Sequence, residues 1–201
     1  MLIEHEDVSP ILADDVYVAP TAVVSGDVRL AKGCRVLFGA VITADGGPVE
    51  LGEKCIVMEN AVLRGRSGHG TRLGNHVLVG PHSHINGAVI DDDVFLATGV
   101  SVFPGAQIEA RAEVRINGVV HVNTRLEADA IVPIGWVAVG DPATLFPPEA
   151  HEEIWAMQRE LDFPTTVFGV DRPEPGSTRM HEITRRYSEL FGSHLEDRII
   201  K

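Results

Sequence analysis

The sequence predicts an all-β solenoid, a parallel β-helix of hexapeptide repeats, with α-helices at its C-terminal end. Between Val18 and Trp136 an aliphatic residue returns every six positions. This period fits neither the 3.6-residue repeat of a helix nor the 2-residue repeat of a strand. Three hexads of this kind make one triangular coil of a parallel β-helix. The aliphatic positions are Val18, Val24, Leu30, Val36, Ile42, Leu51, Val57, Leu63, Leu73, Val79, Ile85, Ile90, Leu96, Val102, Ile108, Val114, Val120, Leu126 and Val132.

A second observation supports the coil, because a small residue follows four positions after most of these aliphatic residues. Cys34 and Cys55 are the two cysteines of the chain, and both occupy this small position. We therefore expect them to be buried small hydrophobic residues and not a disulfide or a reactive pair. Other members of the small position are Ala22, Ala40, Ala61, Ser83, Ala106, Ala112, Gly118, Thr124 and Ala130.

Length, composition and charge limit the class of protein. The chain has 201 residues, of which 44% are hydrophobic, and this fits one domain with a sizeable core. Lys and Arg total 17 against 29 Asp and Glu, which gives a net charge of −12. Such a charge repels nucleic acid and anionic lipid, so we expect neither as a partner. Residues 1–20 are acidic and interrupted by Pro10, so we do not expect them to act as a signal peptide. The sequence has no apolar run of membrane-spanning length, and a cytoplasmic location is the default expectation.

The elements follow in a simple order along the chain. Residues 1–15 are expected to be an N-terminal entry segment, and residues 16–142 the hexapeptide-repeat coil. Two Gly-rich interruptions, 44–48 and 66–71, are expected to form outward loops. Loops that protrude from a solenoid are where its functional residues tend to gather.

Residues 143–201 are expected to form a helical tail. A first helix begins after Pro148 and ends at Pro164, residues 170–177 form a linker, and a second helix begins near Thr178. Isolated helices of this length are marginal, so their apolar stripes need the coil or a neighbouring subunit to cover them. The stripes consist of Ile154, Trp155, Gln158 and Leu161 in the first helix and Met180, Ile183, Tyr187, Leu190 and Phe191 in the second.

The repeat also places the polar residues. Each aliphatic residue points into the coil, so its two neighbours point outward. If the 66–71 loop spans the end of one hexad, the aliphatic residues of successive coils stack on one face. His84 then flanks this face, and His82 lies at the preceding corner. The stacked residues are Leu63, Ile85, Val102 and Val120, and their outward neighbours are Arg64, Asn86, Phe103 and His121.

Several phrases resemble the γ-class carbonic anhydrase branch of the left-handed hexapeptide-repeat proteins. They are Val24-Ser25-Gly26-Asp27-Val28-Arg29-Leu30, Val41-Ile42-Thr43-Ala44-Asp45, Gly74-Asn75-His76-Val77-Leu78-Val79-Gly80 and Gly140-Asp141-Pro142-Ala143. The resemblance covers about residues 16–145. It implies a left-handed coil and a homotrimer with a pocket at the subunit interface. A threefold assembly would also bury the outward column and the helix stripes.

The resemblance further implies a Zn²⁺ or Fe²⁺ site between subunits, held by three histidines. The corresponding positions in this sequence are Arg64, Pro81 and Asn86, and none is histidine. Arg cannot bind zinc and Pro has no ligating side-chain atom. The family's Arg-Gly-Asp phrase keeps Asp45 but has Thr43 in place of arginine, and its Gln-Asp pair becomes Met58-Glu59.

Two interpretations of the polar residues stay open. A metal site relocated to His69, His82 and His84 would supply three imidazoles, the arrangement that activates zinc-bound water; alternatively, these histidines are solvated or form hydrogen bonds between subunits. Arg64 either binds an anion or forms an intersubunit ion pair with Glu59 or Asp45. The histidines outside the coil are weaker candidates. They are His5, His151, His181 and His194.

Four functions follow from these readings. The first is a γ-carbonic-anhydrase-like trimer without standard CO₂ hydration, whose interface pocket binds a small molecule or anion near Arg64, Asn86, Glu59 and Asp45. The second is a metal-dependent carbonic anhydrase or lyase with relocated histidine ligands. The third is an acyl-CoA-dependent acyltransferase with an interface histidine, His84 or His121, as general base. The fourth is a purely structural subunit of a larger complex. The first is the function that the sequence favours.

Overall fold

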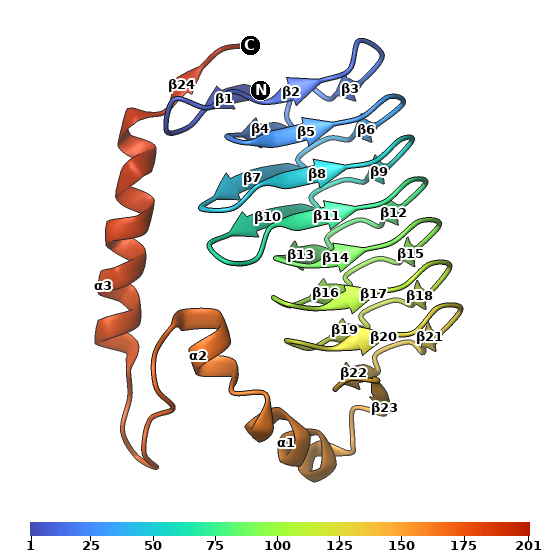
Figure 1. Cartoon of the computed structure of the whole chain (residues 1–201), viewed down its shortest axis with the longest axis vertical. Helices are drawn as coiled ribbons and strands as arrows, with labels where there is room; N and C mark the ends of the chain where they lie inside the picture. The colour runs from blue at the N-terminus through green and yellow to red at the C-terminus, as the bar shows by residue number, and fades with distance from the viewer.

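The computed structural model describes residues 1–201 and is a parallel β-helix with three sheets along its sides (Figure 1). The ten-stranded sheet carries the residues of interest. All its neighbouring strands are parallel except the two at its ends. In spatial order its strands are β23 (Thr144–Phe146), β22 (Val137–Val139), β19 (Val119–Val120), β16 (Ser101–Val102), β13 (His84–Asn86), β10 (Val62–Arg66), β7 (Val41–Asp45), β4 (Val23–Ser25), β1 (Leu2–Glu4) and β24 (Arg198–Ile199).

Two seven-stranded sheets form the other sides of the coil. The second sheet contains β2 (Ile11–Leu12), β5 (Val28–Leu30), β8 (Val49–Leu51), β11 (Thr71–Leu73), β14 (Val89–Ile90), β17 (Gln107–Ile108) and β20 (Arg125–Leu126). The third sheet contains β3 (Tyr17–Val18), β6 (Arg35–Val36), β9 (Ile56–Val57), β12 (Leu78–Val79), β15 (Phe95–Leu96), β18 (Glu113–Val114) and β21 (Ile131–Val132).

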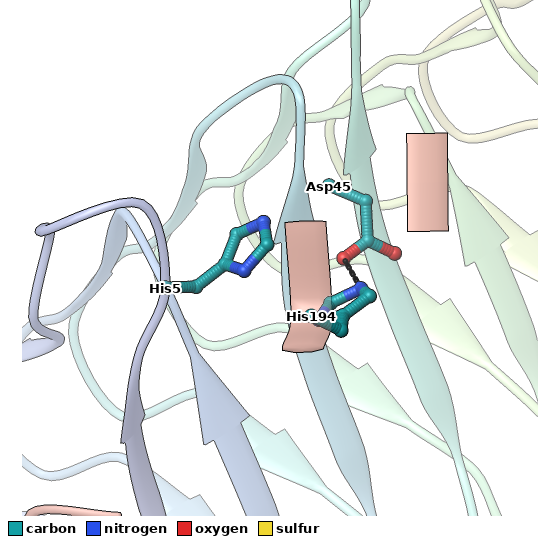
Figure 2. A group of neighbouring side chains, drawn as sticks. All are labelled: His5, Asp45 and His194. Carbon is teal, nitrogen blue, oxygen red and sulfur yellow. Dashed lines mark ion pairs between the residues drawn. The ribbon is translucent and has the colours of Figure 1, made fainter. Parts of the chain in front are cut away.

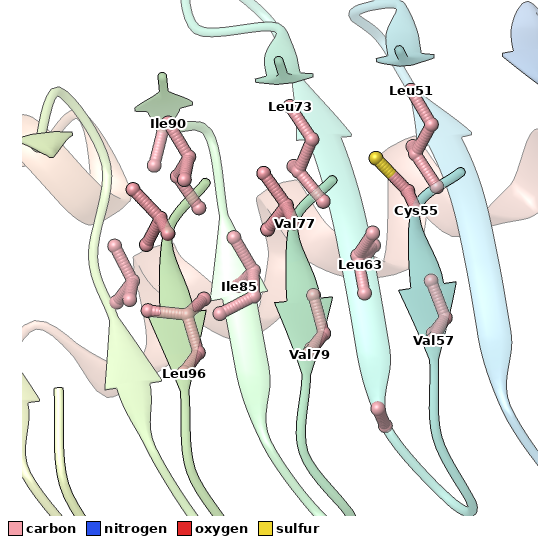
Figure 3. Packing of buried hydrophobic residues seen from close by; sticks show 14 of the residues in the cluster. Leu51, Cys55, Val57, Leu63, Leu73, Val77, Val79, Ile85, Ile90 and Leu96 are labelled. Carbon is pink, nitrogen blue, oxygen red and sulfur yellow. The ribbon is translucent and has the colours of Figure 1, made fainter. Parts of the chain in front are cut away.

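The repeated aliphatic residues fill the interior of the coil, as the six-residue period predicts. Leu63, Ile85 and Val57 are completely buried, and they stack with their counterparts in neighbouring coils (Figure 3). A single cluster of 35 buried residues runs through the coil, so the interior is one continuous core. Burying a side chain of this kind stabilises the fold by about 1.5–3 kcal/mol. Cys34 and Cys55 are buried and unpaired within this core, as expected.

Short antiparallel strands close both ends of the ten-stranded sheet. β24 pairs with β1 at one end, and β23 pairs with β22 at the other. Residues 1–15, which we expected to form an entry segment, contribute β1 and β2 to two of the sheets. Covering a sheet edge in this way removes unpaired backbone groups that could pair with another chain.

The C-terminal helices differ from the expectation at Pro164. Helix α1 covers His151–Glu160, and Pro164 lies in the first turn of a separate short helix, α2 (Phe163–Phe168). Pro fits there because the first backbone N–H groups of a helix have no internal partner. Helix α3 covers Met180–Phe191, and a 3-10 turn over Gly192–Glu196 follows it. No helix of the structure is long and apolar enough to cross a membrane.

Helix α3 stands beside the coil and returns the chain from the β23 end to β1 (Figure 1). The tail contacts its own coil, since Ile154, Val167 and Val170 are buried and Arg66 donates a hydrogen bond to the carbonyl oxygen of Val167. Helix α3 itself has no buried residue. The N- and C-terminal segments therefore meet at the same end of the molecule.

Candidate functional site

The outward column of the ten-stranded sheet has the predicted order. Leu63 pairs with Ile85, and Arg64 pairs with Asn86. In the next coils Ile85 pairs with Val102, and Val102 with Val120. Arg64 and Asn86 therefore lie side by side on the outer surface. Phe103 and His121 come directly after Val102 and Val120, in the next two coils of the same sheet.

Arg64 forms an ion pair with Asp45, at the end of β7. Arg64 Nε lies 3.0 Å from Asp45 Oδ2, and the carboxylate of Asp45 is only 5% exposed. The contact is electrostatic and not an aligned hydrogen bond, because Arg64 Nε has no hydrogen-bond partner of good geometry. Thr43 Oγ1 donates a hydrogen bond of 3.0 Å to the same carboxylate oxygen. Of the two interpretations open for Arg64, the ion pair is present, and it forms within one chain.

Glu59 does not join this pair. It lies at the corner after β9, where its carbonyl oxygen accepts a hydrogen bond of 3.0 Å from the backbone N–H of His82. Of the two carboxylates considered for Arg64, Asp45 is therefore the partner. The strand register explains this choice, because β7 and β10 pair along five residues and Thr43 lies directly opposite Arg64.

The histidines of the relocated metal site do not converge within one chain. No group of three metal-ligating side chains contains His69, His82 or His84. His69 lies in the turn after β10. Its backbone N–H donates a hydrogen bond to the carbonyl oxygen of Arg66, and its carbonyl oxygen accepts one from the N–H of Arg66. The three residues thus come from a turn, a corner and a strand.

His82 has a structural role at its corner. It is exposed and has a φ of 57°, in the left-handed region that Gly, Asn, Asp and His adopt most readily. Six successive coils have a residue with positive φ where the third sheet turns into the ten-stranded sheet. The residues at this corner are Gly39, Asn60, His82, Gly99, Asn117 and Gly135, all with positive φ.

His84 is the histidine of the three that faces the candidate site. It lies on β13, where it pairs with Val62 of the neighbouring strand β10, and it is half-buried. Burial lowers the pKa of His84, and the nearby guanidinium of Arg64 lowers it further. The imidazole is therefore neutral at pH 7 and keeps one nitrogen lone pair.

A cavity of about 900 Å³ lies further along the same sheet, beneath α1, α2 and the linker after α2. Phe103, His121, Trp155, Phe163 and Arg172 are among its lining residues. His121 is 5% exposed, its Nδ1 has no hydrogen-bond partner, and burial lowers its pKa. The helices that cover this histidine belong to the tail.

Two histidines that the sequence ranked as weak candidates reach Asp45. His194 Nε2 lies 3.4 Å from Asp45 Oδ1, and the rings of His5 and His194 stack with centroids 4.4 Å apart (Figure 2). His5, Asp45 and His194 are the one group of metal-ligating side chains whose ligand atoms lie within 4.8 Å of one another. No local sequence signal marks this group, because its members come from both ends of the chain and from the middle of the coil.

Comparisons with known proteins define the class of protein. No protein-family model matches the chain. An acyltransferase for UDP-N-acetylglucosamine from Francisella novicida has a similar structure, with a TM-score of 0.57 and 16% identity over 91% of this chain and 82% of that one. A candidate acetyltransferase from Bacillus cereus has a TM-score of 0.54 and 18% identity over 96% of both chains. The chain is a left-handed parallel β-helix of the hexapeptide-repeat class.

Sequence relatives narrow the class. The chain is 32% identical to "Gamma carbonic anhydrase 2, mitochondrial" of Arabidopsis thaliana over 154 residues, which are 74% of this chain and 53% of the relative. It spans about half the length of the curated relatives it matches. The resemblance predicted from the sequence is confirmed, and the chain is a γ-carbonic-anhydrase-like member of the hexapeptide-repeat proteins.

Proposed function

We propose that this chain is a γ-carbonic-anhydrase-like subunit whose standard metal-ligand positions are substituted and which lacks standard CO₂ hydration. One observation carries the proposal. Arg64, at the first ligand position, pairs with the buried carboxylate of Asp45. Asn86, at the third ligand position, lies directly beside it.

The donor set at these positions does not fit zinc or ferrous iron. A guanidinium has no free lone pair and stays positively charged, so Arg64 repels a cation. Pro81 has no ligating side-chain atom, and an asparagine oxygen is a poor substitute for imidazole at a zinc site. A positive charge held by Asp45 thus occupies the region where the resemblance implies a metal. The same charge suits a small anion, and Arg64 is 37% exposed and open to one.

We also propose a homotrimer with this pocket at the subunit interface. The corner between the third sheet and the ten-stranded sheet carries exposed apolar side chains that one chain does not cover. Phe38, Ile116 and Ile134 are 52%, 45% and 63% exposed. Ile116, Ile134 and Pro81 line a groove of about 530 Å³. Exposed apolar patches of this kind mark protein–protein contact sites. In the proposed trimer, a second copy of the chain covers these apolar side chains.

The assembly is tested by light scattering coupled to size-exclusion chromatography. We expect a mass near three times the 21.7 kDa of one chain. Ile134→Glu places a charge in the proposed interface and is expected to lower the mass, whereas Lys54→Glu, at the corner between the second and third sheets, is expected to leave it unchanged. A wild-type mass of one chain at micromolar concentration would contradict the trimer.

The activity is tested by stopped-flow CO₂ hydration with the full chain, both as purified and after addition of Zn²⁺ or Fe²⁺. We expect the rate to equal that of buffer containing the same metal. A metal-dependent rate that disappears in His84→Ala would contradict this proposal and support a relocated site that uses His84. A control with His181→Ala, an exposed histidine on α3, separates this effect from general loss of a histidine.

A further inference from the structure

Three segments that are distant in sequence bring polar side chains together at the β1 end of the ten-stranded sheet. His5 follows β1, Asp45 ends β7, and His194 lies in the 3-10 turn after α3. Figure 2 shows the two imidazoles and the carboxylate facing one another. His5 and Asp45 are each about 5% exposed, and His194 is 32% exposed. The group is therefore largely shielded from solvent and has one open side.

Asp45 keeps one oxygen available within this group. Its Oδ2 is engaged by Arg64 Nε at 3.0 Å and by the Thr43 hydroxyl at 3.0 Å. Its Oδ1 is buried and accepts no hydrogen bond of good geometry. Burying a carboxylate oxygen without a partner costs free energy, so such an oxygen in a native structure indicates a bound water or ion. From the tail, His194 Nε2 lies 3.4 Å from this oxygen.

A second carboxylate orients both imidazoles. Asp197 Oδ1 lies 2.6 Å from His5 Nδ1, and Asp197 Oδ2 lies 2.9 Å from His194 Nδ1. An ionised carboxylate can only accept hydrogen bonds, so each Nδ1 carries a proton and each neutral ring keeps its lone pair on Nε2. Histidines that bind metals have this arrangement, in which the second ring nitrogen donates to a carboxylate that fixes the tautomer and the ring orientation.

We propose that His5, Asp45 and His194 bind one divalent transition-metal ion of the zinc class. Two imidazole nitrogens and one carboxylate oxygen are a donor set that such ions prefer. Their ligand atoms already lie within 4.8 Å of one another. In a tetrahedral zinc site the ligand atoms are about 3.4 Å apart. Binding therefore requires the stacked rings of His5 and His194 to turn their Nε2 atoms toward Asp45 Oδ1. The open side next to His194 leaves room for water as a further ligand.

This site differs from the position implied by the family resemblance. Two of its three ligands lie outside residues 16–142, on the segment before β2 and on the tail. Arg64 contacts the opposite oxygen of Asp45, so it balances the carboxylate charge without occupying the proposed metal position. A bound ion would fasten the tail to the first coil and stabilise both.

The test is titration of chelator-treated full-length protein with Zn²⁺ in a calorimeter and with Co²⁺ in a spectrophotometer. We expect one equivalent of each ion per chain and the intense visible bands of four-coordinate Co²⁺. His194→Ala and His5→Gln should both lose this equivalent. His181→Ala and His84→Ala are matched controls and should retain it. Circular dichroism is the check that each variant is folded. If His5→Gln does not fold, His194→Ala carries the test, because His194 lies on the tail and is 32% exposed.

Asp197→Asn tests the orienting carboxylate. It removes the charge and one acceptor while keeping the shape, and we expect about 10–100-fold weaker zinc binding with unchanged stoichiometry. Zinc should also raise the melting temperature of the wild type and not that of His194→Ala. No binding by the wild type, or one equivalent that survives in His194→Ala and is lost in His84→Ala, would overturn the proposal. Neither result depends on CO₂ hydration, so the two proposals fail separately.

Discussion

At the residue scale, Asp45 is the point where three parts of the chain meet. Its buried carboxylate contacts Arg64 from the next strand, Thr43 from its own strand and His194 from the tail. The guanidinium of Arg64 in turn lies over the ring of Phe191, 5.6 Å from its centroid. Arg64 is thus held between the coil and the end of α3, in contact with a carboxylate and an aromatic ring.

Removing Arg64 should destabilise the protein. In Arg64→Ala the carboxylate of Asp45 stays buried without its cation, and we expect a loss of about 1–3 kcal/mol of unfolding free energy. The measurement is urea unfolding in the presence of a chelator. Asp45→Asn and the double variant complete a cycle, in which the double variant should lose less than the sum of the single variants. Strictly additive losses would show that the two side chains are not coupled.

His121 should make stability depend on pH. Burial lowers its pKa in the folded state, whereas the unfolded chain has the ordinary value of about 6.5. Below pH 6.5 the unfolded state therefore binds more protons than the folded state, and stability falls as the pH decreases toward the folded-state pKa. The pKa of His84 is also lowered and acts in the same direction.

The measurement is the melting temperature of the wild type, His121→Phe and His151→Gln between pH 7.5 and 5.5. The wild type should lose stability on acidification, and His121→Phe should lose less because one buried neutral imidazole is gone. His151 is exposed at the start of α1, so its variant should follow the wild type. Parallel curves for the wild type and His121→Phe would contradict the assignment.

At the scale of elements, a continuous run of rings fastens the tail to the ten-stranded sheet. Neighbouring rings in the run have centroids 4.4–6.1 Å apart, within the range of favourable aromatic contacts. The run starts over β16 and β19, follows α2 and α3, and ends beside β1. Its members are Phe103, His121, Phe163, Phe168, Tyr187, Phe191, His194 and His5.

Phe191→Ala should loosen the tail and spare the coil. The Phe191 ring stacks on Tyr187 at 5.4 Å and lies under the guanidinium of Arg64. Its loss therefore breaks the run of rings between Tyr187 and His194. We expect faster amide hydrogen exchange over residues 178–201, with unchanged exchange in the buried strands. Leu195→Ala is the matched control, because Leu195 is 92% exposed and contributes no ring. Equal exchange in Phe191→Ala and the wild type would show that the rings do not hold the tail.

The coil elements could be predicted from the sequence, and the tail only in part. The six-residue period fixes which side chains point inward, so Leu63 and Ile85 are buried where the repeat places them. The sequence does not predict the break between α1 and α2, because Pro164 is suited both to the end of one helix and to the start of the next. The sequence also left open which surface covers the helices, because amphipathic stripes do not specify their partner.

At the scale of the molecule, the six-residue repeat of the solenoid determines which residues lie side by side on its surface. Arg64 and Asn86 could be placed side by side in advance because each coil stacks in register on the last. The group of His5, Asp45 and His194 could not, since no repeat connects the ends of the chain to the coil. The backbone role of His82 is visible in the repeat, because the equivalent position of the neighbouring coils holds Gly or Asn.

The central claim is that the metal position implied by the family resemblance holds an Arg64–Asp45 ion pair and no metal. The most direct test is an anomalous difference map, recorded at the zinc edge from crystals of the full chain grown with Zn²⁺. We predict no anomalous peak within coordination distance, about 2.3 Å, of Arg64, Asn86 or His84. A peak there, with Arg64 turned away from Asp45, would contradict the account and restore a metal centre to the outward column.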